Sequence, residues 1–268
     1  MVSRKIRGTL ASLGEIRAQQ AARRKDGSWQ NSLIRWGDDT LFSKHVKARE
    51  PGDIVVIGSR TNVGKSHMML KIMRSAPCHS LYLSLEDSEA VIVDRTATTT
   101  EADDRIIVSR PRPITLSSIL DHIKYAATSI IPFGEPWIVG LDYIQLVQND
   151  TVTQQFSQTQ VIGATLAEIR AAGEEYGFCT VVNAQIVRPP KKKHAEDDED
   201  DEQYIPPRPT LYDLRDSASI ENAATVVIML HGAPHTDWTE ARIEKHKSSR
   251  AGASQMYAKG PTGLLTED

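Results

Sequence analysis

Cysteine is scarce in this chain, which has two in 268 residues, Cys78 and Cys179. They lie far apart in apolar contexts and form no C-x-x-C pair, so neither a zinc site nor a disulfide framework is expected. Cysteine is among the residue types most often buried in protein interiors. The sequence therefore predicts two structural thiols inside a core.

Long apolar runs and an excess of positive charge are missing as well. No stretch reaches the roughly 18 apolar residues that a membrane span needs, and the basic residues 1–5 are not followed by the apolar segment of a secretory signal. We therefore expect a soluble, cytoplasmic protein with no membrane partner. The 32 basic and 35 acidic residues give a formal charge of −3, so any contact with nucleic acid must come from a local basic patch.

Apolar, β-branched runs alternate with helical patterns from residue 53 onward. Such alternation is typical of βαβ units, in which helices join parallel strands. The predicted fold class is therefore α/β, with a mostly parallel central sheet flanked by helices. We predict strands at 53–58, 81–85, 105–108, 137–141, 179–182 and 225–230, and helices at 65–74, 116–127 and 161–176.

Two segments fall outside this alternation. In residues 1–27, apolar side chains recur at helical spacing on a narrow stripe, which favours a helix that docks on a neighbouring surface. We therefore divide the chain into a linker-like helix and tail at 1–30 and one large domain at 31–268. Residues 189–209 combine proline pairs, lysines and an acidic run, so we predict a disordered insertion there, either a solvated spacer or a regulatory or DNA-sensing loop.

A phosphate-binding loop is predicted between the first strand and its helix. Residues 59–66 read S-R-T-N-V-G-K-S and match the pattern G-x-x-x-x-G-K-S/T, except that Ser59 replaces the first glycine. Gly64 allows close approach, Lys65 supplies a charge to the β- and γ-phosphates, and the Ser66 hydroxyl can ligate Mg²⁺. The alternative is a strand–helix turn that happens to contain Gly-Lys-Ser. The expected cofactors are ATP and Mg²⁺, and the predicted nucleotide-binding residues are Ser59, Arg60, Thr61, Asn62, Val63, Gly64, Lys65, Ser66 and His67.

Glu86, Asp142 and Gln185 each follow a predicted strand. The carboxyl ends of parallel strands meet at the edge of the sheet where ligands bind. There Asp142 would hold Mg²⁺ together with Ser66, Glu86 is a candidate general base for the attacking water, and Gln185 is a candidate sensor of the γ-phosphate. A single acid after a strand is more often a turn or cap residue, but the combination in one P-loop domain favours a catalytic site.

The order of these motifs resembles the motor domain of DnaB-type replicative helicases over residues 50–268. The loop at 59–66 is similar to that family's A-R-P-S-M-G-K-T, which also lacks the first glycine, and residues 84–86 match S-L-E. Residues 142–146 are similar to D-Y-L-Q-L, residues 184–188 to S-Q-L-N-R, and residues 213–221 to D-L-R-E-S-G-S-I-E. The resemblance implies a RecA-like P-loop NTPase in which the S-L-E glutamate is the catalytic base.

The resemblance also implies where DNA is held. In the family, the loop that matches residues 213–221 lines a central pore and contacts the DNA backbone, and the segment that matches 184–188 couples the γ-phosphate to DNA. Ala218 replaces a family glycine, which reduces the conformational freedom of the loop. The residues expected to contact DNA are Arg188, Arg215, Asp216, Ser217 and Ala218.

A second departure concerns a basic finger that reaches the neighbouring subunit's nucleotide in the family. The family motif K-x-R reads Lys245-His246-Lys247 here, followed by Arg250. Lysine cannot make the planar bidentate contact of arginine, so either Lys247 is a weaker finger or Arg250 takes that role. An ordinary basic hairpin is the alternative. The expected catalytic residues are Lys65, Glu86, Asp142 and Gln185 within one subunit, and Lys245, Lys247 or Arg250 from the next.

The leading functional prediction is an ATP-dependent helicase or translocase that acts on single-stranded DNA in replication as a homo-oligomer, expected to be a hexameric ring. The family's large N-terminal helical domain has no counterpart in the sequence, which suggests a minimal, phage- or plasmid-type version; replication partner proteins are also expected. One alternative is a RecA-like recombination or annealing ATPase, which shares the P-loop and the strand-end glutamate. Another is an ATP-gated loading or regulatory factor, which the K-x-K finger favours.

Overall fold

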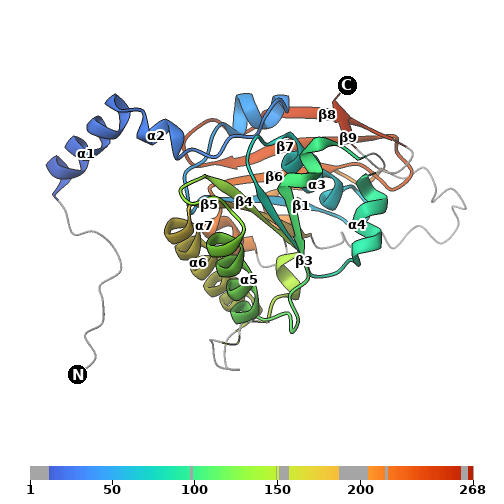
Figure 1. Cartoon of the computed structure of the whole chain (residues 1–268). Coiled ribbons are helices and arrows are strands. Elements are labelled where there is room, and N and C mark those ends of the chain that lie inside the picture. Colours follow the sequence, from blue (N-terminus) through green and yellow to red (C-terminus); the bar gives the residue numbers. More distant parts are fainter. Residues whose placement is uncertain are drawn as a thin grey trace, which may run out of the picture.

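The computed structural model describes residues 12–96, 99–148, 150, 157–186, 205–214, 217–260 and 265–267. A nine-stranded sheet with helices on both faces dominates it (Figure 1). The strands are β1 (Ile54–Ser59), β2 (Ser80–Ser84), β3 (Ile106–Ser109), β4 (Trp137–Asp142), β5 (Phe178–Gln185), β6 (Val226–His231), β7 (Trp238–His246), β8 (Ser254–Lys259) and β9 (Leu265–Glu267). The α-helices are α1 (Leu13–Lys25), α2 (Ser28–Asn31), α3 (Lys65–Ser75), α4 (Glu89–Thr96), α5 (Leu116–Ser129), α6 (Gln158–Tyr176) and α7 (Ser217–Ala223). A π-helical turn spans Leu41–Val46, and 3₁₀ turns span Glu101–Arg105, Ile144–Leu146 and Leu211–Asp213.

The strand order across the sheet is β3-β2-β4-β5-β1-β6-β7-β8-β9. From β3 to β6 all neighbours are parallel, and β7, β8 and β9 add an antiparallel edge. The α/β prediction is confirmed, because each strand predicted from the sequence is present within a few residues of its expected position.

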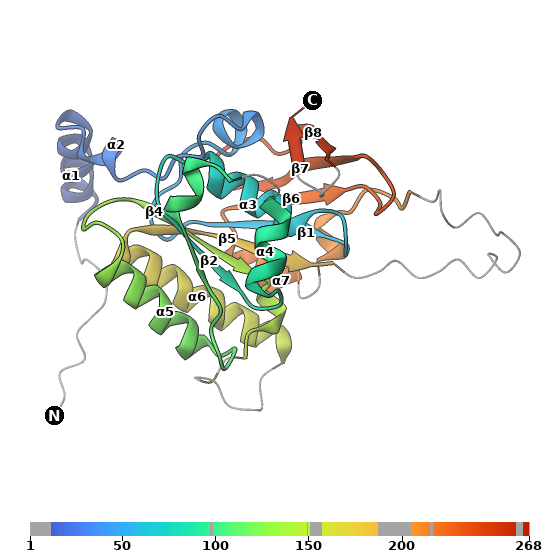
Figure 2. The ribbon, with the colours of Figure 1, turned by 45° about the vertical axis from the view of Figure 1, so that its right-hand side comes forward.

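Two hydrophobic cores lie on opposite faces of the sheet. Helices α5, α6 and α7 cover one face, and α3 and α4 cover the other (Figure 2). Strand β1 is buried at every position because it contributes alternately to the two cores, which explains its continuous apolar run. Cys179 lies in the α3-side core as predicted, whereas Cys78 is only partly buried at its margin.

Gly140 lets α3 lie directly on the centre of the sheet. A Cβ at this position of β4 would stand 2.2 Å from Met73 Cε and 2.7 Å from Met69 Sδ, both on α3. The two methionine side chains fill the space that any other residue would occupy. The helix that follows the phosphate-binding loop is therefore held close to the strand that ends in Asp142.

The antiparallel edge and α4, like the short helices α2 and α7, are elements that the sequence did not reveal. Strand β7 carries buried polar residues, Thr239, Glu240 and His246, so it lacks the apolar alternation by which a strand is recognised. In α4, Ile92 is the buried residue and Val93 is exposed, so no apolar face stands out. The segment predicted as a possible basic hairpin at 244–250 is the end of β7 and its turn toward β8.

The N-terminal helix stands away from the body of the molecule (Figure 1). A capping box between Ser12 and Glu15 starts α1, and none of its residues is buried. Leu13 and Ile16, from the predicted apolar stripe, are 64% and 43% exposed. Docking of this stripe on another surface and a domain boundary near residue 30 stay predictions, and residues 1–11 lie outside the described part.

The predicted acidic insertion at 189–209 falls mostly outside the described residues, but its C-terminal end is held in place. The carbonyl of Pro207 accepts a hydrogen bond from Arg60, and the carbonyl of Pro206 is 3.0 Å from His231 Nε2. Arg208 pairs with Glu240 on β7 at 2.6 Å. This end therefore differs from the predicted mobile loop, because its carbonyls and one arginine find fixed partners.

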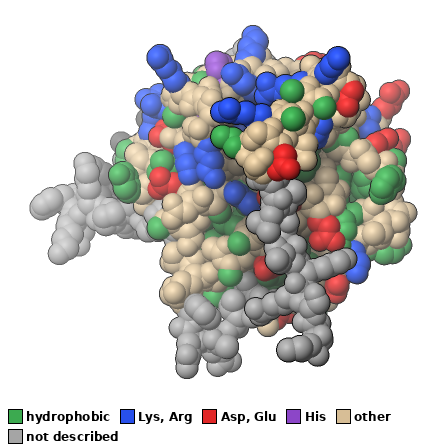
Figure 3. All heavy atoms as spheres, turned by 90° about the vertical axis from the view of Figure 1, so that its left-hand side faces the viewer, with side chains coloured by type: hydrophobic (Ala, Val, Ile, Leu, Met, Phe, Trp, Pro, Cys, Tyr) green, Lys and Arg blue, Asp and Glu red, His purple; other side chains and the backbone are tan. Residues whose placement is uncertain are grey.

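The surface carries its charge unevenly. Figure 3 shows many lysine and arginine side chains over the upper part of one face, with acidic side chains among them and further down the face. A formal charge of −3 therefore hides a local basic area. No helix among the described residues is long and apolar enough to cross a membrane.

Candidate active site

The loop between β1 and α3 has the geometry of an anion cradle. Gly64 precedes α3 with a φ of 113°, a conformation that glycine adopts without steric cost, and Asn62 has a φ of 60°. Within the described part of the chain, no side chain caps the N-terminus of α3, so its first N–H groups are open to a ligand. Backbone N–H groups and the helix dipole at such a terminus favour phosphate.

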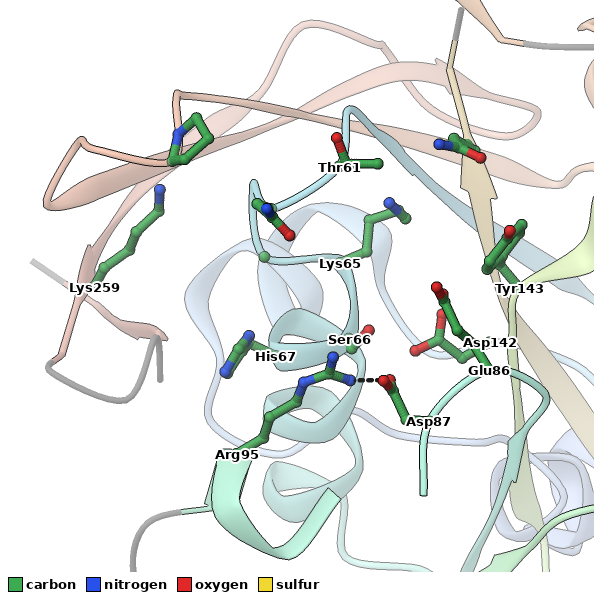
Figure 4. A pocket seen from close by; sticks show the side chains of 14 residues that line it. Thr61, Lys65, Ser66, His67, Glu86, Asp87, Arg95, Asp142, Tyr143 and Lys259 are labelled. Carbon is green, nitrogen blue, oxygen red and sulfur yellow. Dashed lines mark hydrogen bonds and ion pairs between the residues drawn. The ribbon is translucent and has the colours of Figure 1, made fainter. Parts of the chain in front are cut away.

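A pocket of about 340 Å³ opens beside this helix terminus. Its wall contains the predicted loop residues Thr61, Asn62, Gly64, Lys65, Ser66 and His67 and the predicted strand-end residues Glu86, Asp142 and Gln185 (Figure 4). The structure thus brings together residues that lie far apart in the sequence.

The sheet order explains why the strand-end residues meet. Strands β2, β4, β5 and β1 are consecutive neighbours, so their carboxyl ends lie along one edge. Ser84 pairs with Asp142 across β2 and β4, and Ser59 pairs with Gln185 across β1 and β5. Glu86 follows β2 by two residues and is exposed at the pocket, rather than directly ending the strand as predicted.

Lys65 is half-buried between these groups. Burial lowers the pKa of its ammonium, and the negative charges of Asp142 and Glu86 act in the opposite direction. Its Nζ donates a 3.4 Å hydrogen bond to the backbone carbonyl of Arg60. A phosphate entering the pocket would replace these weak contacts with a strong charge-assisted one.

Asp142 and Gln185 are fixed by neighbouring strands. Asp142 is 4% exposed, and its Oδ2 accepts a 2.7 Å hydrogen bond from the Tyr82 hydroxyl. The side chain of Gln145 bonds the backbone of Gln185 twice, donating to its carbonyl at 3.2 Å and accepting from its N–H at 3.1 Å. These bonds anchor the strand end while leaving the Gln185 side chain at the pocket.

The donor set suits a divalent cation shared with phosphates. Ser66 and Asp142 offer hard oxygen ligands within one pocket, as Mg²⁺ prefers. Within the described ranges, no group of three His, Cys, Asp or Glu side chains converges to hold a metal alone. A cation here would therefore take its remaining ligands from water and from a bound nucleotide.

Comparison with known proteins agrees with this geometry. Residues 102–263 match the family model described as the DnaB-like helicase C terminal domain. The chain belongs to this family. The matched range begins after the phosphate-binding loop, so the assignment of residues 59–66 rests on the motif and the pocket.

Curated relatives and solved structures point the same way. The replicative DNA helicases DnaB of Mycoplasma pneumoniae and Mycoplasma genitalium are 26% and 25% identical over 76% and 68% of this chain. The chain spans about half the length of these relatives, 50% and 43%. A solved ATPase domain superposes with a TM-score of 0.72 at 17% identity, covering 97% of this chain and 99% of that one. A DnaB-like replicative helicase studied with primase superposes with a TM-score of 0.68 at 17% identity, over 96% of this chain and 67% of that one.

Three predicted nucleotide-binding residues of this DnaB-like domain, Ser59, Arg60 and Val63, do not line the pocket. Ser59 is fully buried and donates to the carbonyl of Arg60, and Arg60 reaches the 206–208 segment. Val63 is buried in the α3-side core, and its carbonyl accepts from Thr239. These three residues could bind nucleotide through their backbone N–H groups, and this role stays a prediction.

The pocket also contains residues that the sequence did not single out. Arg95 on α4 pairs with Asp87, which follows the predicted base Glu86 (Figure 4). Lys259 from β8 lies across the pocket, where its Nζ donates to the carbonyl of Ala233 at 2.7 Å. Tyr143 and Pro234 complete the wall. Asp87 and Arg95 lie eight residues apart in the sequence. The sequence could not show that they pair, because Arg95 lies on α4, a helix that was not predicted.

The candidate finger residues, which would act on a neighbouring subunit, lie at the opposite end of the strands from the pocket. Lys245 pairs with Val227 near the start of β6, whereas the pocket lies at the carboxyl ends of the parallel strands. Lys245 is partly buried and its Nζ donates to the backbone carbonyl of Glu221 in α7. Lys247 and Arg250 are exposed. Lys245 is therefore too far from the pocket of its own chain to act there. Its role on the pocket of a neighbouring subunit stays a prediction.

Most of the predicted DNA contacts lie outside the described part of the chain. This holds for Arg188, Arg215, Asp216 and the side chain of Ser217. Ala218 is exposed in the first turn of α7, whose last turn receives the hydrogen bond from Lys245. The predicted DNA segment and the predicted finger are thus joined through one short helix.

Proposed function

We propose that this chain is the ATP-hydrolysing motor of a replicative helicase that moves on single-stranded DNA as a ring of identical subunits. The observation that carries the proposal is the convergence of Lys65, Ser66, Glu86, Asp142 and Gln185 on one pocket in a chain of the DnaB-like helicase C terminal domain family. The relatives named DnaB support the DNA substrate and the place in replication.

Each residue has a distinct role in this proposal. The α3 N-terminus and Lys65 would bind the β- and γ-phosphates, and Ser66 with Asp142, which line the same pocket, would hold Mg²⁺. The bound metal would neutralise charge that develops on the phosphates during transfer. Glu86, exposed at the pocket, accepts the proton of the attacking water, and Gln185 contacts the terminal phosphate.

The remaining parts of the motor come from other surfaces. Lys247 or Arg250 of the next subunit would complete the charge around the terminal phosphate. Residues 215–218 would grip the DNA backbone, with Arg188 linking that grip to Gln185. A replication partner such as primase, with which a structural neighbour was studied, is part of the same proposal.

The decisive test measures the ATPase rate with and without single-stranded DNA for the wild type and for Glu86→Gln. We expect DNA to stimulate the wild type, and Glu86→Gln to lose at least about a hundredfold in rate while still binding nucleotide. Glu89→Gln, an exposed change three residues away in α4, is the matched control and should leave the rate unchanged.

A rate that is absent or indifferent to DNA would contradict the motor. Such a result, with nucleotide binding intact, would favour an ATP-gated loading or regulatory factor. ATP-dependent filaments on DNA without strand displacement would instead favour a recombination or annealing ATPase.

A further inference from the structure

Tyr82 is a buried polar residue that the proposed chemistry does not yet use. It lies in β2, is fully buried, and belongs to the core between the sheet and α3. Its hydroxyl donates a 2.7 Å hydrogen bond to Oδ2 of Asp142. A buried tyrosine hydroxyl needs an acceptor, and here the acceptor is the candidate metal-binding carboxylate.

The strand register shows that this contact reaches forward along β4. Tyr82 is paired with Gly140, two residues before Asp142, so its hydroxyl extends toward the carboxyl end of the neighbouring strand. The N–H of Leu85, just before Glu86, donates to the backbone carbonyl of Asp142 at 2.9 Å. The β2 segment therefore holds Asp142 by its side chain and by its backbone, next to the candidate general base.

The contact from Tyr82 also decides which oxygen of the Asp142 carboxylate stays available for a ligand. Within the described residues, no other side chain donates a hydrogen bond to Asp142. Asp142 nevertheless lines the pocket, so part of its carboxylate faces the space that a ligand would fill. Oδ2 is thus occupied by Tyr82, and the second oxygen is left for a ligand in the pocket.

We propose that Tyr82 is a positioning residue that orients Asp142 for a divalent cation through its hydroxyl. The inference rests on the proposed function, because the cation it serves is the one that accompanies the nucleotide. Mg²⁺ demands near-octahedral geometry and is commonly bound through one or two carboxylates, so a carboxylate with one oxygen already engaged suits it. Second-layer hydrogen bonds of this kind orient ligands and tune metal affinity.

The buried setting of the Tyr82 hydroxyl keeps it a hydrogen-bond donor to Asp142. Burial and the charge of Asp142 raise the pKa of the Tyr82 hydroxyl far above its usual range, so the hydroxyl keeps its proton.

The test is Tyr82→Phe, with binding of a fluorescent ATP analogue followed as Mg²⁺ is titrated. We expect the Mg²⁺ concentration that gives half-maximal tight binding to rise about tenfold. Nucleotide binding in EDTA should stay unchanged, because the phosphate cradle is not altered. Tyr82→Met offers the same comparison should the phenylalanine variant fail to fold.

Tyr257→Phe is the matched control. Tyr257 is also fully buried, and its hydroxyl donates to the buried carboxylate of Asp39 at 3.0 Å, outside the pocket. Both variants should lose thermal stability, but Tyr257→Phe should leave the Mg²⁺ titration unchanged. In an Asp142→Asn background, Tyr82→Phe should cause no further shift.

The possible results separate this inference from the proposed function. Equal Mg²⁺ titrations for wild type and Tyr82→Phe, or equal shifts in both tyrosine variants, would overturn the role of Tyr82 and leave the motor intact. A wild type whose nucleotide binding does not respond to Mg²⁺ would overturn the metal-dependent site itself.

Discussion

Lys65 illustrates how the environment of one residue prepares it for an anionic ligand. Its ammonium has been moved out of water toward Asp142 and Glu86, and burial lowers its pKa more than these carboxylates restore it. A bound phosphate would add negative charge beside the ammonium and favour its protonated form. In the proposed function, binding of nucleotide and protonation of Lys65 are therefore linked.

This linkage predicts a pH dependence of nucleotide affinity. Because the pKa of Lys65 lies below the ordinary lysine value of about 10.4, its charge begins to disappear at a lower pH than that of exposed lysines. Affinity should fall as pH rises through this alkaline window, and titration of nucleotide binding from neutral pH up to about 10 would measure it. Lys65→Arg should bind more weakly at neutral pH but show no such fall. A wild-type affinity that stays constant across this range would contradict the linkage.

The same shift has a consequence for folding with a defined sign. Between the lowered pKa of Lys65 and the ordinary value, the unfolded chain binds more protons than the folded one. The Lys65 contribution to the free energy of unfolding therefore increases as pH rises through that window. As pH rises through this window, the stability of the fold should increase while nucleotide affinity decreases. The burial of Lys65 therefore favours ligand binding at the expense of stability.

At the scale of elements, the end of β7 places the two lysines of the K-x-K motif, Lys245 and Lys247, in different environments. The pairing of β6 with β7 slips between Val227, opposite Lys245, and Ile228, opposite Ile243, so Glu244 is an extra residue in β7. Such a bulge re-aims the side chains that follow it. Lys245 reaches the Glu221 carbonyl in the last turn of α7, and Lys247 remains exposed.

Substitution should separate the roles of these two lysines. Lys245→Ala removes a charged donor from a helix C-terminus and should lower the free energy of unfolding by about 1 kcal/mol. Lys247→Ala should leave stability unchanged, lower the ATPase rate of the assembled protein, and preserve nucleotide affinity. Thermal melting and steady-state ATPase assays on both variants measure the difference. The assignment is wrong if Lys247→Ala has full activity, in which case Arg250→Ala becomes the variant to examine.

The antiparallel edge also contributes directly to the pocket. Lys259 in β8 faces the phosphate-binding loop from the far side, and burial lowers the pKa of its ammonium while Asp237 opposes the shift. Thr239 in β7 bonds the carbonyl of Val63 within the loop. The strands that the sequence did not reveal are therefore part of the wall of the candidate nucleotide pocket.

For the whole molecule, the proposed DNA binding would depend on charge and on assembly. The chain carries a formal charge of −3, yet one face gathers lysine and arginine side chains (Figure 3). A few phosphate contacts per subunit are weak alone and become strong when several subunits engage one strand. DNA binding should therefore depend on oligomerisation.

This dependence is measurable as a salt slope. For a ring with one or two phosphate contacts in each of about six subunits, log K against log salt should have a slope of roughly −4 to −8. Fluorescence anisotropy with labelled oligothymidine, on samples whose assembly is checked by sedimentation, would give the slope. A slope of about −1 in fully assembled protein would contradict a DNA grip shared among subunits.

The local parts of this protein could be predicted from its sequence. Runs of apolar residues indicated which segments become strands, and the pattern at 59–66 with the acids at Glu86 and Asp142 indicated residues most of which line one pocket. These features are predictable because each depends on neighbours within a few residues. Strand periodicity, a glycine at a positive φ and a helix start are all local properties.

How these parts meet became visible only in the folded chain. The strand order β2-β4-β5-β1 brings Glu86, Asp142 and Gln185 to one edge, and α4 and β8 add Arg95 and Lys259. The bond from Tyr82 to Asp142 spans 60 positions and depends on a register that no sequence window contains. Polar residues such as those of β7 are buried because of partners distant in the chain, so the pattern that would reveal them exists only in the folded molecule.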